Sequence, residues 1–256
     1  MIPKKIHYCW FGGNPLPESA QKCIKSWRKF CPDYEIIEWN EKNFDVSSAP
    51  LYVRQAYEAK KWAFVSDYAR LDIIYQRGGI YLDTDVEIIK SFDELLINRG
   101  FAGFESSEYV ALGLGFGAEP RNPVVGILRD RYLQLEFIKS DGTYDFTPIP
   151  VINTKDLEKL GLVKNGQKQI VDDCFTVYPM DYFCPKSFVD GVITLTQNTY
   201  SIHHFDASWL TDEQQRDLRN RWKEKQIKIK KKARRAKIKS VLTKIMGEKL
   251  YKKIRG

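Results

Sequence analysis

The sequence predicts an α/β fold that opens with a βαβ nucleotide-binding unit, and two stretches carry this prediction. Strand-like runs at residues 6–11 and 34–39 flank a helix-like segment at residues 20–30. A strand, a helix and a strand within about 40 residues are the start of such a unit. Farther along, residues 60–76 form the strongest helical pattern of the chain and lead into an apolar run at residues 80–89. This alternation indicates a Rossmann-like sheet covered by helices.

Turn and helix signals bound the opening unit. The first strand-like run is rich in β-branched and aromatic residues and stops at Gly12-Gly13-Asn14-Pro15, a turn sequence. In the segment after it, Ile24, Trp27 and Phe30 recur near helical spacing. The second run ends at Asn40, which again indicates a turn.

The helix predicted over residues 60–76 has one apolar stripe and a clear end. It stops at Arg77-Gly78-Gly79, a basic last residue followed by a glycine stop. The strand predicted immediately after it, over residues 80–89, is interrupted by two carboxylates. The stripe consists of Phe64, Tyr68, Leu71 and Tyr75, at positions i, i+4, i+7 and i+11.

The second half of the chain is predicted from shorter patterns. Glycines recur between residues 100 and 120 and indicate short strands and tight loops. A helical pattern covers residues 122–137, and Gly142, Pro148 and Pro150 predict an irregular loop over residues 140–153. Two further strands are predicted at residues 176–179 and 192–195.

Charge divides the chain into two parts, which the net value of +8 conceals. Residues 219–256 contain 17 lysines and arginines against two acidic residues, whereas residues 1–218 contain 24 basic and 31 acidic residues. We therefore predict one globular domain over residues 1–218 and a basic helical tail over residues 219–256. Because the apolar positions of the tail fall into two stripes that do not align, two helical pieces are expected rather than one continuous helix.

The basic tail has two interpretations. Its clustered cations and apolar side chains favour docking on an anionic membrane surface, and the alternative is a solvated helical tail. A nucleic-acid-binding protein acting through the tail is a competing class of function. That class would also need a basic face on the globular domain, yet residues 1–218 are net acidic, so no nucleic-acid partner is expected.

The cysteines and the N-terminus favour a cytoplasmic protein. The five cysteines are odd in number and form no CxxC pair, so we expect reduced and mostly buried thiols rather than disulfides or a zinc site. The first residues have no apolar core like that of a signal peptide. No apolar run reaches the roughly 18 residues that a membrane span requires.

Asp83-Thr84-Asp85 is the strongest chemical signal. Residues i and i+2 of a strand point to the same side, so both carboxylates can reach one cation. At the end of a strand in an open α/β sheet they would lie in the ligand crevice. Two hard oxygen donors suit Mg²⁺ or Mn²⁺ shared with phosphate oxygens. A solvated turn is the alternative, but unpaired carboxylates within an apolar run would be costly.

Asp67 and Arg70 form a second signal, and their spacing leaves two interpretations open. They lie three residues apart in the predicted helix and share a face. They form either an ordinary surface ion pair, or an acceptor for sugar hydroxyls beside an arginine that binds phosphate in bidentate fashion.

Two of the three histidines are adjacent, at His203 and His204. Neighbouring residues of a strand point in opposite directions, so only one of the two can face a given site. A pair of histidines is more often structural than ligating. Near a divalent ion, one neutral imidazole could complete the coordination.

Taken in order along the chain, these blocks resemble glycosyltransferase family 32. The similar segments are residues 2–15, Ser66-Asp67 with Arg70, residues 78–85, and His203-His204 with Ser208-Trp209. The resemblance covers about residues 1–210. It implies a GT-A fold, a nucleotide-sugar donor, Mn²⁺ or Mg²⁺ as cofactor, and transfer with retention of the anomeric configuration.

The resemblance also implies a role for each matching residue in binding the donor. Trp10 would stack on the nucleotide base, and Asp67 and Arg70 would hold the donor sugar and its phosphate. Tyr81 would belong to the donor site, while Ser208 and Trp209 would close over the diphosphate and the glycosidic oxygen. For the two tryptophans, core packing is the alternative.

The metal ligands are implied in the same way. Asp85 would bind the metal directly, and Asp83 would contact the ribose or sugar and the waters of the metal. His204 best matches the late ligand position of the family, with His203 as the second choice. The expected catalytic residues are therefore Asp83, Asp85 and Arg70, and the expected metal ligands are Asp83, Asp85 and His204.

A carboxylate nucleophile for double displacement cannot be assigned from the sequence. Our hypothesis is therefore front-face substitution, in which the leaving phosphate oxygen helps to deprotonate the acceptor while Arg70 and the metal stabilise charge. Four carboxylates are candidates for the nucleophile, and none is favoured: Glu105, Asp172, Asp173 and Asp181.

The sequence thus predicts a retaining hexosyltransferase of polysaccharide biosynthesis. A UDP-sugar is favoured as donor over a GDP-sugar, the acceptor is a glycan or lipid-linked oligosaccharide, and the location is the cytoplasm, including the inner face of the membrane. A nucleotide-sugar hydrolase or phosphodiesterase is the nearest enzymatic alternative.

Overall fold

The computed structural model describes residues 1–207 and 210–246, and the chain forms two compact units. The first unit combines Met1–Lys186 with Thr194–Trp209, and the second combines Ser187–Ile193 with Leu210–Gly256. The functional boundary after residue 218 stays a prediction. Predicted donor-site residues Ser208 and Trp209 lie outside the described residues.

A mixed, eight-stranded sheet forms the centre of the first unit. Its strands are β1 (Lys5–Cys9), β2 (Glu35–Trp39), β3 (Gly79–Tyr81), β5 (Gly100–Phe104), β6 (Val110–Ala111), β7 (Phe116–Ala118), β8 (Gln169–Val171) and β9 (Phe175–Tyr178). They follow the order β2-β1-β3-β7-β5-β9-β8, and β6 pairs with β5. The predicted α/β fold is confirmed.

Strand direction fixes which loops share an edge of this sheet. β1 is parallel to β2 and β3, and β5 is parallel to β9. β7 runs antiparallel to both β3 and β5, so β1, β2, β3, β5 and β9 all point the same way. We call the edge where these five strands end the carboxyl edge; it is where open α/β sheets bind ligands.

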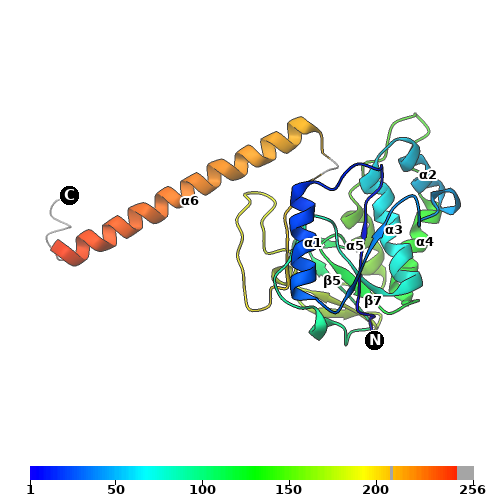
Figure 1. Ribbon diagram of the computed structural model, residues 1–256, viewed down its shortest axis with the longest axis horizontal. Helices are drawn as coiled ribbons and strands as arrows, with labels where there is room; N and C mark the ends of the chain where they lie inside the picture. The colour runs from blue at the N-terminus through cyan, green and yellow to red at the C-terminus, as the bar shows by residue number, and fades with distance from the viewer. Residues whose placement is uncertain (208–209, 247–256) are drawn as a thin grey trace. The chain divides into compact units, whose positions relative to one another are not determined.

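Five helices of the first unit accompany the sheet: α1 (Glu18–Phe30), α2 (Leu51–Glu58), α3 (Trp62–Arg77), α4 (Pro123–Asp130) and α5 (Ile149–Lys159). In Figure 1, α2, α3 and α4 lie together on one side of the sheet, and α1 lies apart from them. Short 3-10 turns occur at η1 (Val46–Ser48), η2 (Asp93–Leu95), η3 (Arg131–Gln134) and η4 (Met180–Tyr182).

The predicted helix over residues 60–76 is confirmed as α3, and Gly78 ends it as predicted. Gly78 has φ 63°, and a Cβ there would lie 2.6 Å from the Pro120 ring, so no other residue fits without movement. α3 buries Phe64, Leu71 and Ile74 in the main core. Asp67 lies three residues after Phe64 on the same face, and Arg70 links it to Asp83 at the carboxyl edge.

The strand predicted over residues 80–89 is wrong, because the chain changes sheets within it. β3 ends at Tyr81, and β4 (Val86–Ile88) pairs antiparallel with β10 (Ser201–His203) in a separate two-stranded sheet. Asp83 and Asp85 therefore lie in the connecting turn rather than in a strand. In this turn, hydrogen bonding to Asp85 and the ion pair of Asp83 with Arg70 offset the cost of burying the carboxylates.

Three smaller predictions also differ from the structure. The loop predicted over residues 140–153 ends early, because α5 begins at Ile149 with Pro150 in its first turn, where proline fits a helix. The helix predicted over residues 122–137 ends as η3 at Gln134. Residues 192–195 form no strand in the described part of the chain.

The second unit is built on α6 (Asp212–Met246), one continuous helix. The prediction of two helical pieces is wrong: residues 212–246 contain no glycine or proline and are rich in strong helix formers. Near its start, Trp222 Nε1 donates to the Phe188 carbonyl over 2.9 Å, and Lys225 lies 3.6 Å from Asp190.

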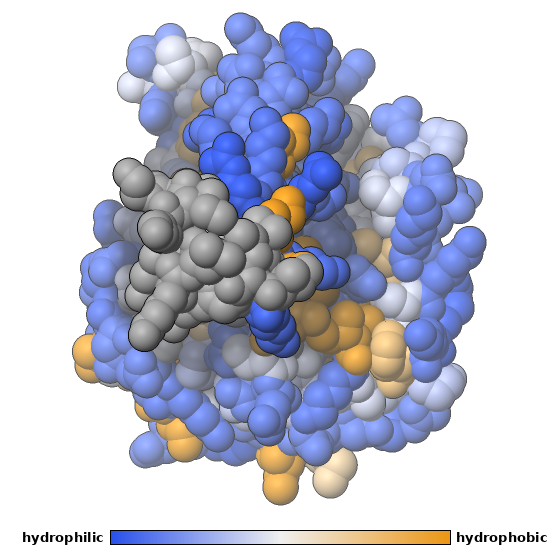
Figure 2. All heavy atoms as spheres, turned by 90° about the vertical axis from the view of Figure 1, so that its left-hand side faces the viewer, coloured by the Kyte–Doolittle hydropathy of each residue, from blue (hydrophilic) through white to orange (hydrophobic). Residues whose placement is uncertain are grey.

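The surface seen in Figure 2 is mostly hydrophilic, with hydrophobic residues only in small groups. This agrees with the exposure of every residue from 223 to 238 of α6. None of the described helices is long and apolar enough to span a bilayer.

Candidate active site

Asp83 leaves the sheet at the carboxyl edge, directly after β3 and Leu82. The hydroxyl of Tyr81 donates to Asp83 Oδ1 over 3.0 Å, and the Asp83 N–H donates to the Gly113 carbonyl over 3.2 Å. A Cβ at Gly113 would lie 2.1 Å from Asp83 Oδ2, so a larger residue there would displace the carboxylate. The aspartate is thus held from its own strand and from the loop before β7.

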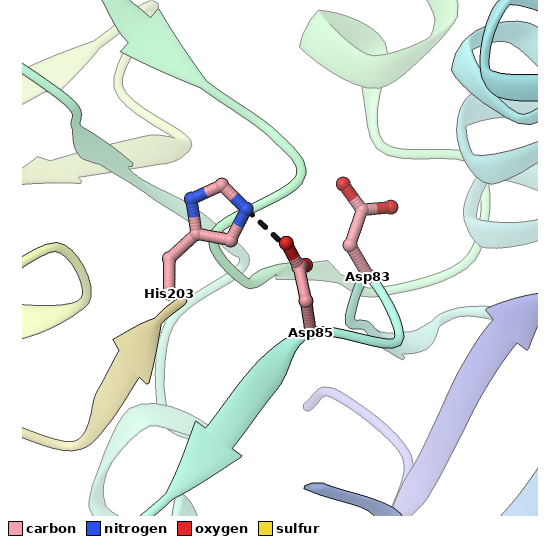
Figure 3. Close-up of side chains that lie close together, drawn as sticks. All are labelled: Asp83, Asp85 and His203. Carbon is pink, nitrogen blue, oxygen red and sulfur yellow. Dashed lines mark ion pairs between the residues drawn. The ribbon is translucent and has the colours of Figure 1, made fainter. Parts of the chain in front are cut away.

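His203 completes a group with the two aspartates. Asp83, Asp85 and His203 each offer one ligand atom, and these atoms all lie within 4.8 Å of one another. His203 Nε2 lies 3.2 Å from Asp85 Oδ1. Figure 3 shows the ring of His203, carried by β10, pointing at Asp85, with Asp83 on the other side of the turn. Two carboxylates and one imidazole form a donor set that Mn²⁺ accepts and that Mg²⁺ accepts through its carboxylates.

The structure brings His203, and not the expected His204, to the two aspartates. β10 pairs with β4 so that His203 faces Val86, and alternation in a strand then turns the next side chain away. His204 Nε2 instead lies 2.8 Å from Glu87 Oε2. The strand pairing that decides between the histidines is a long-range contact, so only the alternative itself could be predicted.

Asp85 also holds the segment that follows His203. Its Oδ2 accepts from the Asp206 N–H over 2.8 Å, and its carbonyl accepts from the His204 N–H over 2.9 Å. The Lys186 ammonium donates to the His204 carbonyl. Burial opposes ionisation of Asp85, but the charge of His203 and the hydrogen bonds to Asp85 lower its pKa to about 2. The carboxylate is therefore ionised at neutral pH.

Arg70 links the helix to the turn that carries Asp83 and Asp85. Its Nη2 lies 3.0 Å from Asp67 Oδ1 and 3.2 Å from Asp83 Oδ1, and its side chain is only 8% exposed. The ordinary surface ion pair is thereby excluded as an interpretation. Burial raises the pKa of Asp67 to about 6, against the opposing effect of Arg70. One buried cation thus sits between two carboxylates at the carboxyl edge.

Trp10 follows β1 at the same edge and is only partly buried. Its Nε1 donates to the Asn14 carbonyl over 2.5 Å, which fixes the indole against the turn predicted after this strand. Core packing is therefore not its role. Its neighbour Gly12 donates its N–H to Glu41 Oε1 over 2.7 Å.

Strand direction separates the four candidate nucleophiles. Asp172 and Asp173 precede β9 and lie at the opposite edge from Asp83. Asp181 follows β9, but its Oδ2 accepts from Thr196 and Asn198. Glu105 directly follows β5 at the carboxyl edge. Burial raises its pKa, which the charge of His203 partly opposes, so Glu105 lies near His203.

Comparison with known proteins gives the arrangement a context. Residues 17–102 match the sequence profile of a "Glycosyltransferase sugar-binding region containing DXD motif". This match includes Asp67, Arg70, Asp83 and Asp85 but ends long before His203. The two carboxylates of the turn are thus the DXD motif of that description.

Two fission-yeast proteins are similar over part of their length. Inositol phosphoceramide mannosyltransferase 3 of Schizosaccharomyces pombe is 35% identical over 99 residues, which cover 37% of this chain and 27% of that protein. Inositol phosphoceramide mannosyltransferase 1 of the same organism is 30% identical over 133 residues, covering 48% of this chain and 40% of that protein. The chain thus matches less than half the length of either relative.

The solved structure of PaToxG glycosyltransferase is similar in fold. It superposes with a TM-score of 0.50 at 20% identity and covers 62% of this chain and 69% of that chain. At this identity the likeness shows the fold alone, and it agrees with a GT-A fold built on a mixed sheet.

Proposed function

We propose that this chain is a glycosyltransferase of the family-32 type and that it transfers a hexose from a nucleoside diphosphate sugar to a glycan or lipid-linked oligosaccharide. The observation that carries the proposal is the meeting of Asp83, Asp85 and His203 within 4.8 Å, beside the buried Arg70. A divalent-ion site and a fixed guanidinium at one edge suit a diphosphate better than any neutral ligand.

The residues present fit a bound Mn²⁺ or Mg²⁺. Asp85 and His203 would hold the ion, with Asp83 beside them, and the absent Cβ of Gly113 leaves Asp83 the room that it occupies. When bound, the ion neutralises negative charge on the departing diphosphate.

Arg70 and Asp67 would hold the donor. The pKa of Arg70 is raised by Asp83, Tyr81 and Asp67 although burial opposes protonation, so the guanidinium stays charged and can donate to phosphate oxygens. Asp67 would accept from sugar hydroxyls. Trp10, fixed at the end of β1, would stack on the base.

Retention is proposed to arise by front-face substitution. The acceptor oxygen bonds to the anomeric carbon as the bond from that carbon to the phosphate oxygen breaks, and the acceptor proton passes to the leaving phosphate. Arg70 stabilises the charge that develops there. Of the four carboxylates considered, Glu105 is the one that could instead act as the nucleophile of a double displacement.

The proposed context is polysaccharide biosynthesis, with a UDP-sugar favoured as donor. The similarity to mannosyltransferases makes GDP-mannose the main alternative. A thermal-shift panel of UDP- and GDP-sugars with Mn²⁺ or Mg²⁺, repeated in EDTA, tests the choice of donor and the need for a metal. A donor that raises the melting temperature only with the metal supports the proposal, whereas no response to any nucleotide sugar refutes it. Donor cleavage that no glycan accelerates would instead favour the hydrolase.

Peripheral docking on an anionic membrane is proposed for the second unit, at the inner face of the cytoplasmic membrane. α6 exposes the cations of residues 223–238 together with Ile227, Ile229 and Ile238. Anionic lipid attracts such segments by about 1 kcal/mol per nearby base, and the apolar side chains can enter the interface.

Vesicle co-sedimentation tests this docking. A variant with Lys230, Lys231 and Lys232 changed to Glu should bind anionic vesicles far less than the unchanged chain, and high salt should weaken the binding of the unchanged chain. Equal binding of the two proteins would refute the docking.

A further inference from the structure

Residues 137–147 form a short hairpin between η3 and α5. An isolated bridge pairs Ile138 with Tyr144, and the Asp145 N–H donates to the Phe137 carbonyl over 2.8 Å. At its base, Gln55 Oε1 of α2 accepts from the N–H groups of Phe137 and Ile138 over 2.8 and 3.1 Å. The hairpin is therefore fixed to the helical layer and can hold side chains in set positions.

Two aromatic rings of this hairpin remain exposed. Tyr144 is 37% exposed and Phe146 is 53% exposed. Tyr144 stacks on the fully buried Phe137, with ring centroids 5.1 Å apart, and Phe146 contacts Phe64 of α3 at 5.7 Å. Each ring thus has one side fixed by protein and another left to solvent, an arrangement that folding alone does not favour.

Lys61 places a cation beside the same two rings. Its Nζ lies 6.0 Å from the Tyr144 centroid and 5.7 Å from the Phe146 centroid. Within residues 1–207 and 210–246, no carboxylate lies within ion-pair distance of this ammonium. The surface therefore combines apolar ring faces with a hydrogen-bond donor that remains available.

The hairpin lies next to the residue proposed to hold the donor sugar. Phe64, which contacts Phe146, is three residues before Asp67 on α3, a spacing that puts two side chains on one face about 5–6 Å apart. Phe137 also contacts Tyr52, with ring centroids 5.5 Å apart. Burial raises the pKa of Tyr52, and the nearby charges of Asp67 and Asp145 raise it further. Tyr52 thus lies near Asp67 as well as near the hairpin.

We propose that Tyr144, Phe146 and Lys61 form the subsite for the acceptor, and that its occupant is a pyranose ring of a glycan. A pyranose presents an apolar face of C–H groups and a rim of hydroxyls, which match an aromatic ring and a nearby ammonium. The base of the donor is assigned to Trp10, and no residues have yet been assigned to binding the acceptor. The exposed rings can therefore serve the acceptor. This inference rests on the proposed function, because it needs a donor held at Asp67.

Saturation-transfer NMR with methyl pyranosides of glucose, mannose, galactose and N-acetylglucosamine tests the subsite in the full chain, with Mg²⁺ and UDP or GDP present. The ring C–H protons of at least one pyranoside should receive saturation. Phe146→Ala and Tyr144→Ala should each weaken binding by about three- to tenfold, the range expected for one aromatic contact. Phe146→Trp should retain it.

Ile97→Ala is the matched control, because Ile97 is exposed, apolar and placed before β5 at the opposite edge. It should leave sugar binding unchanged, and the thermal shift with nucleotide sugar should be the same in all the variants. Unchanged sugar binding in the two alanine variants, or no pyranoside bound by the unchanged chain, would overturn the subsite. If no nucleotide sugar raised the melting temperature of the unchanged chain, the proposed function would be overturned instead.

Discussion

Arg70 Nη2 lies 3.2 Å from Asp83 Oδ1 and so joins α3 to the turn that carries Asp83 and Asp85. The same nitrogen contacts Asp67 at 3.0 Å. Because the guanidinium is buried and contacts two carboxylates, its position and its charge are set before any substrate binds.

Arg70→Lys should therefore abolish most of the activity without unfolding the protein. A lysine keeps the charge but cannot contact Asp67, Asp83 and a phosphate with one planar group. We expect kcat to fall by about 100-fold or more, the usual effect of removing one preorganised donor. Steady-state kinetics would measure it, with Arg99→Lys at the surface as control. A loss of less than about threefold would contradict the role of Arg70.

The two histidines should differ in metal binding. His203→Gln should weaken Mn²⁺ binding by about 100-fold, a loss typical of a group that holds or orients a metal ligand. His204→Gln should bind Mn²⁺ almost as well as the unchanged chain, because His204 contacts Glu87 instead. Calorimetric titration with Mn²⁺ compares them. The reverse order would restore His204 to the position that the sequence favoured.

Glu105→Gln separates the two routes to retention. If substitution is front-face, a carboxylate after β5 is not a nucleophile, and turnover should stay within about tenfold of the unchanged chain. Asp173→Asn is the control, because Asp173 lies at the opposite edge, and it should have no effect. Intact-mass analysis would detect a glycosyl group covalently bound at Glu105, and such an adduct would refute the front-face route.

His7 should make the protein less stable in acid. Trp39 Nε1 can only donate, so His7 Nδ1 accepts, and Nε2–H donates to the Gly78 carbonyl. Burial lowers the pKa of His7 to about 4 from its usual 6.5. The folded state thus favours neutral His7, and its contribution is complete above pH 6.5 and is lost as the pH falls toward 4. The maximum loss is about 3 kcal/mol.

Urea unfolding at pH 7.5, 6 and 5 measures this dependence. His7→Gln should be less stable at pH 7.5 but should lose less stability between pH 7.5 and 5 than the unchanged chain. His204→Gln, near the surface, should keep the full acid dependence. Parallel pH profiles for His7→Gln and the unchanged chain would show that another group titrates.

Local patterns predicted the elements whose neighbours in the sequence decide their structure. α3, its glycine end and the opening βαβ unit follow from spacing and composition, and so does the pairing of Asp67 with Arg70. The change of sheet after Tyr81 was not predictable, because β4 leaves the main sheet to pair with β10, which lies more than a hundred residues later. The same distant pairing selects His203.

The candidate site was predictable as a set of residue types and less so as a geometry. Glu105 could not be separated from Asp172 and Asp173 until strand direction put them at opposite edges. The continuity of α6 was missed for another reason. A continuous apolar stripe indicates that a helix has a buried face. An exposed helix such as α6 needs no such stripe, because the helix propensities of its residues support it.

The change of sheet at Asp83 has a mechanical consequence. Asp83 follows β3 of the large sheet, whereas His203 lies in β10 of the two-stranded sheet and Asp85 directly precedes β4 of that sheet. An ion bound by the side chains of Asp83, Asp85 and His203 would cross-link the two sheets. The affinity of the ion would then add to the cohesion of the fold, so loading the cofactor should stiffen the junction between the two sheets as well as prepare the site for its donor.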